Sequence, residues 1–275
     1  MGFLMANIVG RILSTSTGQD SILGSIEYFS HALHYLFTSQ QWIRLQRRLG
    51  FPARRKSDIA LESVGRSPSS SLMLLSSLLS DTRYTLRLFG LVSLWTQTSE
   101  IIQTPPEDAA IHALEVIQLL ASIVYQLLEN VAYLASKNIL PRRIIEKWSD
   151  IDRWYMWSAR GLLIHMLLQL GKLWREKTLR RRREETSTSS ISLTKSVDGA
   201  RMAVKTQEAR GLEILAWRKD LFSSSVWALL CLNWSYGGGI GIPDKVTGAL
   251  SLLADSVVLR DLWKMDDVVG GFRMG

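Results

Sequence analysis

The residue types that most often carry out chemistry are few in this sequence and lie far apart. His31 and His34 are three residues apart on a predicted helix, a spacing that could hold a metal ion, but no third ligand lies nearby in the sequence. Their aromatic neighbours indicate packing instead. Cys231 stands in an apolar run without a nearby histidine, which favours an inert, packed thiol. We therefore expect no metal site and no nucleophilic cysteine.

The glycine cluster between Gly237 and Gly241 superficially resembles a phosphate-binding loop. It follows an apolar run that contains tryptophan, lacks the Lys-Ser/Thr ending, and occurs in a sequence with no evident parallel sheet. The sequence also contains neither a G-x-S-x-G nucleophile elbow nor an H-E-x-x-H zinc motif. We therefore expect a protein that is not an enzyme and that carries no catalytic residues and no cofactor.

The segment from Ser71 to Phe89 has the most informative pattern in the sequence. At 100° per residue, bulky side chains gather on one side of the predicted helix, namely Leu75, Leu78, Leu79, Thr82, Leu86 and Phe89. The opposite side is made of small hydroxyls and two cations, namely Ser76, Ser80, Arg83 and Arg87. Periodicity alone is compatible with a helix that packs on a protein core. A polar face of serine and arginine opposite leucine and phenylalanine is also what an interfacial membrane helix needs.

The composition permits a membrane partner and limits the other possibilities. Hydrophobic residues make up 47% of the 275 residues and charged residues 21%, and the mean hydropathy is +0.07. The formal net charge of +8 suits either nucleic acid or an anionic membrane surface. A basic stretch from Arg44 to Lys56 contains no acidic residue. It fits a solvated loop as well as a headgroup-contacting patch.

The elements that would position these residues are predicted to be helices throughout. Prolines fall between periodic segments, and no run shows sustained two-residue alternation. A first helix is predicted from Thr17 to Phe37. Helices are also expected from Ala109 to Ala135, a poor lipid-exposed span because it contains several polar residues, and from Asp152 to Trp174, which tryptophans flank. The expected class is all-α, a membrane-associated helical bundle with an interfacial helix and a C-terminal hydrophobic segment.

Three regions are expected along the chain. Residues 1–175 form an N-terminal helical region that includes the amphipathic helix over 71–90. Residues 176–210 are expected to be a basic, Ser/Thr-rich flexible loop. Residues 211–275 form a C-terminal membrane segment, in which 221–243 contains no charged residue and is long enough to span a bilayer. Small residues around Gly248 would allow close approach of another helix.

The order of these segments resembles that of the peroxin 11 family. Leu74 to Gly90 resembles the family's amphipathic helix, which ends in a similar S-x-x-R-x-x-x-R-L-x-G pattern. Further resemblances are the runs Tyr125 to Leu134, Lys147-Trp-Ser, Arg153 to Ser158, and Gly241-Ile-Pro with Gly248-Ala-Leu-Ser-Leu-Leu-Ala. The chain departs from the family pattern at Glu129 and Tyr133, where Asp and Trp are frequent, and in its long basic loop. These departures indicate a divergent, fungal-type member.

The resemblance implies a protein of the peroxisomal membrane that elongates the organelle before fission. It implies as partners anionic membrane lipids, further copies of the chain or of a paralogue, and dynamin-related fission machinery, but not nucleic acid. On this interpretation Leu75, Leu78, Leu79, Leu86 and Phe89 insert into one leaflet. Arg83 and Arg87 would then bind headgroups.

Two other interpretations stay open at this point. In the first, the chain is a helical adaptor whose apolar stripes are all internal and whose basic loops bind an acidic partner. In the second, it is a solute channel of the same membrane, an activity also proposed for the family, with a pore lined by Glu115, Gln126, Glu129 and Arg160. Extraction with carbonate would separate a soluble adaptor from a membrane protein.

Overall fold

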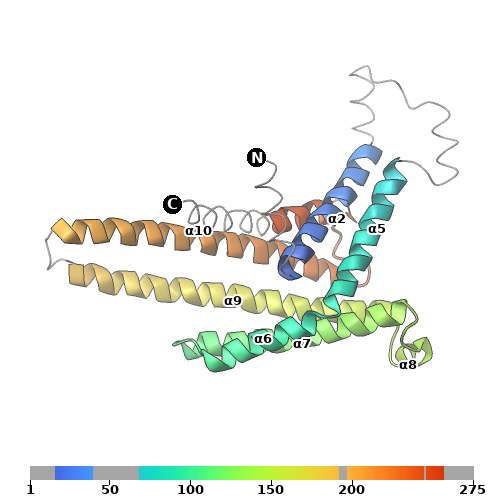
Figure 1. Cartoon of the computed structure of the whole chain (residues 1–275), viewed down its shortest axis with the longest axis horizontal. Coiled ribbons are helices and arrows are strands. Elements are labelled where there is room, and N and C mark those ends of the chain that lie inside the picture. Colours follow the sequence, from blue (N-terminus) through green and yellow to red (C-terminus); the bar gives the residue numbers. More distant parts are fainter. Residues whose placement is uncertain (1–15, 40–67, 192–196, 245, 257–275) are drawn as a thin grey trace, which may run out of the picture. The chain divides into compact units, whose positions relative to one another are not determined.

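The computed structural model describes residues 16–39, 68–191, 197–244 and 246–256, and all regular elements in these residues are α-helices. The predicted all-α class is thereby confirmed. The helices in chain order are α2 (Ser16–Thr38), α5 (Pro68–Arg87), α6 (Gly90–Gln103), α7 (Ala109–Ser136), α8 (Arg142–Glu146), α9 (Ile151–Ile191) and α10 (Val197–Trp234), shown in Figure 1. Residues 246–256 are helical too, apart from these. The basic stretch over 44–56 lies outside the described residues.

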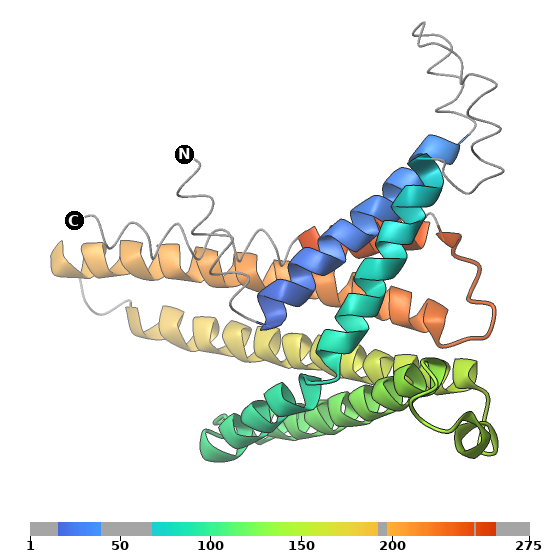
Figure 2. The same cartoon turned by 45° about the vertical axis from the view of Figure 1, so that its right-hand side comes forward.

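The chain divides into two compact units. The first unit takes its residues from Met1–Phe89 and Ile240–Gly275, and in it α2 and α5 lie side by side (Figures 1 and 2). The second unit is Gly90–Gly239. Within it α9 contacts both α7 and α10, and α6 packs on α7.

Local signals set the ends of the helices in the second unit. The Asp108 carboxylate caps α7 by accepting hydrogen bonds from the backbone N–H groups of Ala110 and Ile111, at 2.9 and 3.1 Å. After α10, Gly238 and Gly239 adopt φ values of 105° and 73°, which other residues rarely adopt. A Cβ on Gly239 would lie 2.7 Å from Asn233 Oδ1. The glycine cluster therefore forms a tight turn at the end of a helix.

The predicted flexible loop over 176–210 is wrong for most of its length. α9 continues without a break to Ile191, and α10 begins at Val197; residues 192–196 lie outside the described part of the chain. Arginine, lysine and glutamate are good helix formers, so a charged composition alone does not end a helix. Arg181 also pairs with Glu185 one turn later, at 3.2 Å.

The predicted C-terminal span over 221–243 is also wrong as a continuous helix, because α10 ends at Trp234. That leaves fewer helical residues than the ~20 that cross a bilayer. Among the described residues, α7 is the helix that is long and apolar enough to cross a membrane, and almost none of its apolar window is buried within the structure. The helix that the sequence pattern rated as a poor span is therefore the best candidate.

Candidate membrane-interaction surface

The apolar side of α5 faces outward. Leu78 is 63% exposed, and Leu75 and Leu86 are exposed as well. The helix ends at Arg87, before the predicted end of the amphipathic helix, so Phe89, which is 73% exposed, lies in the turn after it. Leu79, the remaining member of the predicted set, is half-buried. Leu74, which the wheel did not single out, is also strongly exposed and extends the surface toward the start of the helix. We call the exposed set Leu74, Leu75, Leu78, Leu86 and Phe89 the α5 stripe.

The opposite side of α5 is buried against α2 through Arg83. Its Nε donates to Asp20 Oδ1 at 2.9 Å and its Nη1 to Glu27 Oε2 at 2.8 Å, and the guanidinium lies 5.2 Å from the centre of the Tyr28 ring. The Arg83 side chain is only 7% exposed. Arg87 is half-buried and pairs with Asp20 at 3.2 Å. We call Asp20, Glu27, Arg83 and Arg87 the α2–α5 ion cluster.

The headgroup contact expected for Arg83 is therefore not available in this arrangement. A wheel of α5 cannot show that α2 presents Asp20 and Glu27, seven residues apart, on one face opposite this arginine. The seven-residue spacing of Asp20 and Glu27 is the sequence signal for this cluster. Arg83 acts here as the residue that positions α5, while Arg87 keeps partial access to solvent.

The electrostatics of the cluster keep Asp20 and Arg83 charged. Burial acts to raise the pKa of Asp20, but the hydrogen bond from Arg83 and the charge of Arg87 outweigh it and lower that pKa to about 2. Burial likewise acts to lower the pKa of Arg83, and the bonded Asp20 carboxylate outweighs it and raises the pKa further above its usual range. At neutral pH Asp20 and Arg83 are therefore both ionised.

A third carboxyl group faces the same arginine from the helical residues 246–256. Asp255 is buried, and its Oδ2 atom has no hydrogen-bond partner in the described part of the chain. A Cβ added to Gly24 would lie 2.6 Å from that oxygen and 2.9 Å from Arg83 Cζ, so glycine leaves the space that both groups occupy. Burial raises the pKa of Asp255 to about 6, against the opposing charge of Arg83.

We predict that the first unit becomes more stable as the pH falls from 7 to 4. The folded state holds a proton on Asp255 between its usual pKa of 3.8 and about 6, so the free energy of unfolding decreases as the pH rises through this window. Of the groups that face it, Asp20 and Arg83 keep their charges there, because the pKa of Asp20 is lowered to about 2 and that of Arg83 is raised above its usual range. The expected change is on the order of 2 kcal/mol. Asp255→Asn should raise stability at pH 7 and flatten the dependence, measured by thermal unfolding in detergent; an unchanged slope would contradict the prediction.

α2 repeats the arrangement of α5. It presents exposed apolar side chains on its outer side, namely Ile26, Phe29, Leu36 and Phe37, and buries polar ones inside, namely Ser21 and Ser30. His31 and His34 pack edge-on against Tyr35, as their aromatic neighbours predicted. A Cβ on Gly248 would lie 2.7 Å from His31 Nδ1, which confirms the predicted close helix approach there. Polar groups inside and apolar groups outside are the reverse of a water-soluble bundle.

The second unit shows the same reversal along α7. Its outer side is apolar and exposed, with Val116, Ile117, Leu120, Val124 and Leu127. Its inner side is polar and buried, with Ser122, Gln126 and Glu129. Polar side chains that face a neighbouring helix and find partners there are compatible with a membrane-embedded helix, because the lipid meets only the other side.

The four polar residues considered for a pore all have internal partners. Glu115 Oε1 accepts from Lys172 Nζ at 2.6 Å, and Gln126 donates to Asn130 at 2.9 Å. Glu129 accepts from the Tyr125 hydroxyl at 3.0 Å, and Arg160 Nε donates to the Ser235 carbonyl at 3.1 Å. Only Glu115 of the four lines the cavity described below. Of these contacts, Glu115–Lys172 joins α7 to α9, whereas those of Gln126 and Glu129 lie within α7.

The part of the chain that contains α5 and the second unit is similar to known proteins. A sequence model of the family described as Peroxisomal biogenesis factor 11 (PEX11) matches residues 57–263. The human protein named Peroxisomal membrane protein 11C is 27% identical over 198 residues, which are 70% of this chain and 78% of the human protein. No solved structure matches the chain. The family match contains all of α5 and the whole second unit, whereas α2 precedes it.

Proposed function

Because this chain belongs to the peroxisomal biogenesis factor 11 family, and so is a peroxisomal membrane protein with a role in the biogenesis of that organelle, we propose that it curves and elongates the membrane with α5. The α5 stripe inserts into one leaflet while the polar side of α5 stays on α2. The observation that carries the proposal is the orientation of the helix: Leu78 and Leu86 are exposed and Arg83 is buried.

The energetics support insertion of the stripe. Burying a leucine or phenylalanine side chain fully is worth about 1.5–3 kcal/mol, and the five members of the stripe are each only partly covered by protein. A helix that enters the boundary between headgroups and acyl chains of one leaflet expands that leaflet's area alone. Unequal areas bend the bilayer, which is the first step in drawing a tubule from a round organelle.

The adaptor interpretation fits the described residues less well. It requires the apolar stripes of the chain to be internal, whereas those of α2, α5 and α7 are exposed. An acidic partner would leave these stripes in water, and exposed apolar surface of this extent is typical of a contact with lipid or with another protein.

The family resemblance also supports proposals about partners. We expect anionic lipids near Arg87, association with further copies or a paralogue, and a later action of dynamin-related fission machinery on the elongated membrane. None of these partners is a nucleic acid. The exposed apolar surfaces of both units are compatible with self-association within the membrane plane.

We predict that Leu78→Glu abolishes most of the membrane elongation. The substitution removes an apolar side chain from the centre of the stripe and adds a charge that resists entry into the leaflet, and each 1.4 kcal/mol lost is a factor of about ten. The test is to reconstitute the full-length protein into anionic vesicles and count tubules by negative-stain microscopy. We expect the number of tubules to fall by about tenfold or more.

The matched control is Leu212→Glu on α10. It places the same charge at a leucine of similar exposure (71%) that is not part of the stripe. It should leave tubule formation close to that of the unchanged protein. Phe89→Glu at the end of the stripe should act like Leu78→Glu. If both stripe variants formed tubules normally, insertion of α5 would not be the source of curvature.

A further inference from the structure

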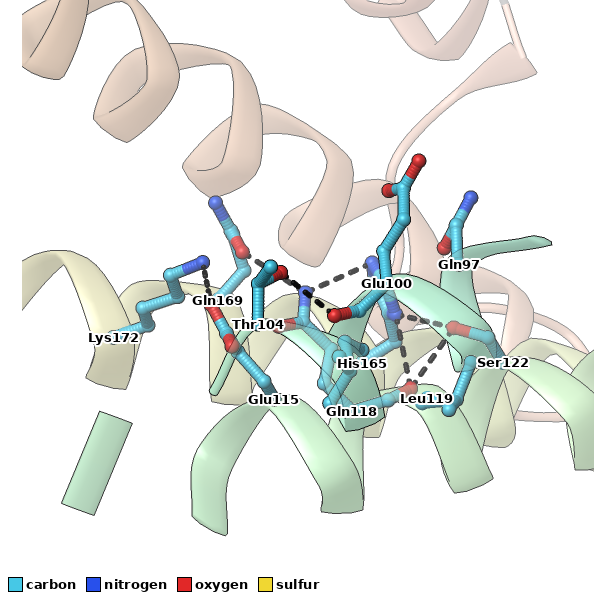
Figure 3. Close-up of a pocket in the computed structure, with 11 residues that line it drawn as sticks. Gln97, Glu100, Thr104, Glu115, Gln118, Leu119, Ser122, His165, Gln169 and Lys172 are labelled. Atoms are coloured by element: carbon cyan, nitrogen blue, oxygen red, sulfur yellow. Dashed lines mark hydrogen bonds and ion pairs between the residues drawn. The ribbon is translucent and has the colours of Figure 1, made fainter. Parts of the chain in front are cut away.

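A polar cavity lies in the second unit between α6, α7 and α9, with a volume of about 370 Å³ (Figure 3). Volumes of this size hold small ligands or parts of larger ones. The lining contains two carboxylates and one ammonium group, from Glu100, Glu115 and Lys172, and its other polar members are Gln97, Thr104, Gln118, Ser122, His165 and Gln169. It is separate from the α5 stripe and does not depend on the proposed function of that stripe.

The floor of the cavity is held in place by hydrogen bonds between α7 and α9. Gln118 Nε2 donates to Gln169 Oε1 at 2.9 Å and lies 3.1 Å from His165 Nε2. Ser122 Oγ lies 2.6 Å from His165 Nδ1 and donates to the Gln118 carbonyl. The fixed side chains provide both donors and acceptors before any ligand arrives, which lowers the entropy lost on binding.

The charged groups occupy different parts of the lining. Lys172 and Glu115 form an ion pair at 2.6 Å, and each is about one-fifth to one-quarter exposed. The Glu100 carboxylate makes no ion pair within the described residues, and Figure 3 shows it pointing away from that pair. A ligand could therefore meet an unpaired anion at one position and an accessible ammonium group at another.

The position of the cavity along α7 sets its depth in a bilayer. The 28 residues of α7 extend over about 42 Å, which exceeds the ~30 Å of the hydrocarbon layer. Glu115 lies six residues after the first residue of α7, which is about 9 Å along the helix. With α7 across the bilayer, the charged part of the cavity lies close to the boundary between headgroups and acyl chains.

We propose that this cavity binds the headgroup of a phospholipid with a primary ammonium group, of the phosphatidylethanolamine type. The ammonium group of the lipid pairs with Glu100, and the phosphate of the same headgroup pairs with Lys172. A purely anionic headgroup is disfavoured, because the lining has more carboxylates than cations. A choline headgroup is disfavoured as well, because quaternary ammonium groups are recognised by aromatic cages and no Phe, Tyr or Trp side chain lines the cavity as far as the chain is described.

The test is to place the full-length protein in nanodiscs with equal amounts of phosphatidylethanolamine, phosphatidylcholine and phosphatidylglycerol of identical acyl chains. Native mass spectrometry then counts the lipids that remain bound. A charge-assisted hydrogen bond is worth about 1.5–3 kcal/mol, so we expect about tenfold more phosphatidylethanolamine than either other lipid. Glu100→Gln should remove most of this preference without affecting folding, since Glu100 is exposed.

The control is Glu107→Gln, which removes one carboxylate at an exposed residue outside the lining and should retain the preference. Lys172→Arg, which keeps the cation, should retain it too. Equal retention of the three lipids, a preference for phosphatidylglycerol, or unchanged binding in Glu100→Gln would each overturn the proposal. Displacement of the lipid by free phosphoethanolamine at micromolar concentration would assign the cavity to a soluble ligand instead.

Discussion

Arg83→Gln is expected to release α5 from α2 and to lower the free energy of unfolding of the first unit by about 3–5 kcal/mol. Removing one partner of a buried ion pair leaves the other charges uncompensated, and that penalty exceeds the value of the pair itself. Here Asp20 would keep its 3.2 Å pair with Arg87 but lose its bonds from Arg83, and Glu27, whose side chain is only 14% exposed, would lose its bond from Arg83. Asp255 would lose the cation that offsets its burial.

Amide hydrogen exchange of the full-length protein in detergent would measure this release. The amides of α2 and α5 should exchange markedly faster in Arg83→Gln, while those of α7 and α9 in the other unit should not change. Arg87→Gln is the matched control, because Arg87 is half-buried and its pair with Asp20 is longer, at 3.2 Å; half-exposed pairs contribute about 1 kcal/mol or less. Equal exchange in the two variants would refute a special role of Arg83.

The same variant distinguishes a positioning role of Arg83 from contact with headgroups. A residue that binds anionic headgroups affects membrane binding only where the lipid is anionic, and salt screens its effect. A residue that holds α5 on α2 affects curvature in neutral and anionic vesicles alike. We expect Arg83→Gln to impair tubule formation in both, and Arg83→Lys to restore little, since lysine keeps the charge but not the two-pronged geometry.

The α5 stripe could be predicted from the sequence because it depends on local geometry. Residues three and four apart fall on one side of a helix whatever surrounds it, and Leu75, Leu78 and Leu86 are accordingly all exposed. The role of Arg83 could not be predicted in this way. It depends on Asp20 and Glu27, which are 63 and 56 residues away in the sequence.

The assignment of the membrane span failed for a related reason. Counting polar residues in α7 assumes that each one meets lipid, whereas Glu115, Gln126 and Glu129 bond to Lys172, Asn130 and Tyr125. The charge-free run over 221–243 favours a span by composition alone, although the helix ends at Trp234, before its glycines. A stripe of polar residues at helical spacing on α9, with His165, Gln169 and Lys172, was the available signal that α7 had a polar partner.

Gly161→Leu is expected to separate α7 from α9 and to destabilise the second unit by about 3 kcal/mol or more. A Cβ at Gly161 would lie 3.2 Å from Tyr125 Cα and 3.3 Å from Tyr125 N, and these backbone atoms cannot move aside as a flexible side chain can. Ser158, one turn earlier, donates to the Tyr125 carbonyl at 3.1 Å, so small residues bring the two backbones together here. Adding bulk at such a contact strains the packing by about 1–3 kcal/mol, and a larger side chain here adds the loss of neighbouring bonds.

The consequences of Gly161→Leu extend to the polar contacts between α7 and α9, since separating the helices parts Gln118 and Ser122 from His165. Thermal unfolding in detergent would measure the loss of stability, and the phosphatidylethanolamine preference should fall with it. Gly211→Leu on α10 is the matched control, because a Cβ there meets no atom within 4 Å and glycine-to-leucine in an open helix position raises helix propensity. If Gly161→Leu were as stable as Gly211→Leu, α7 and α9 would not pack through this glycine, and the paired arrangement that hides the polar side of α7 from lipid would have to be abandoned.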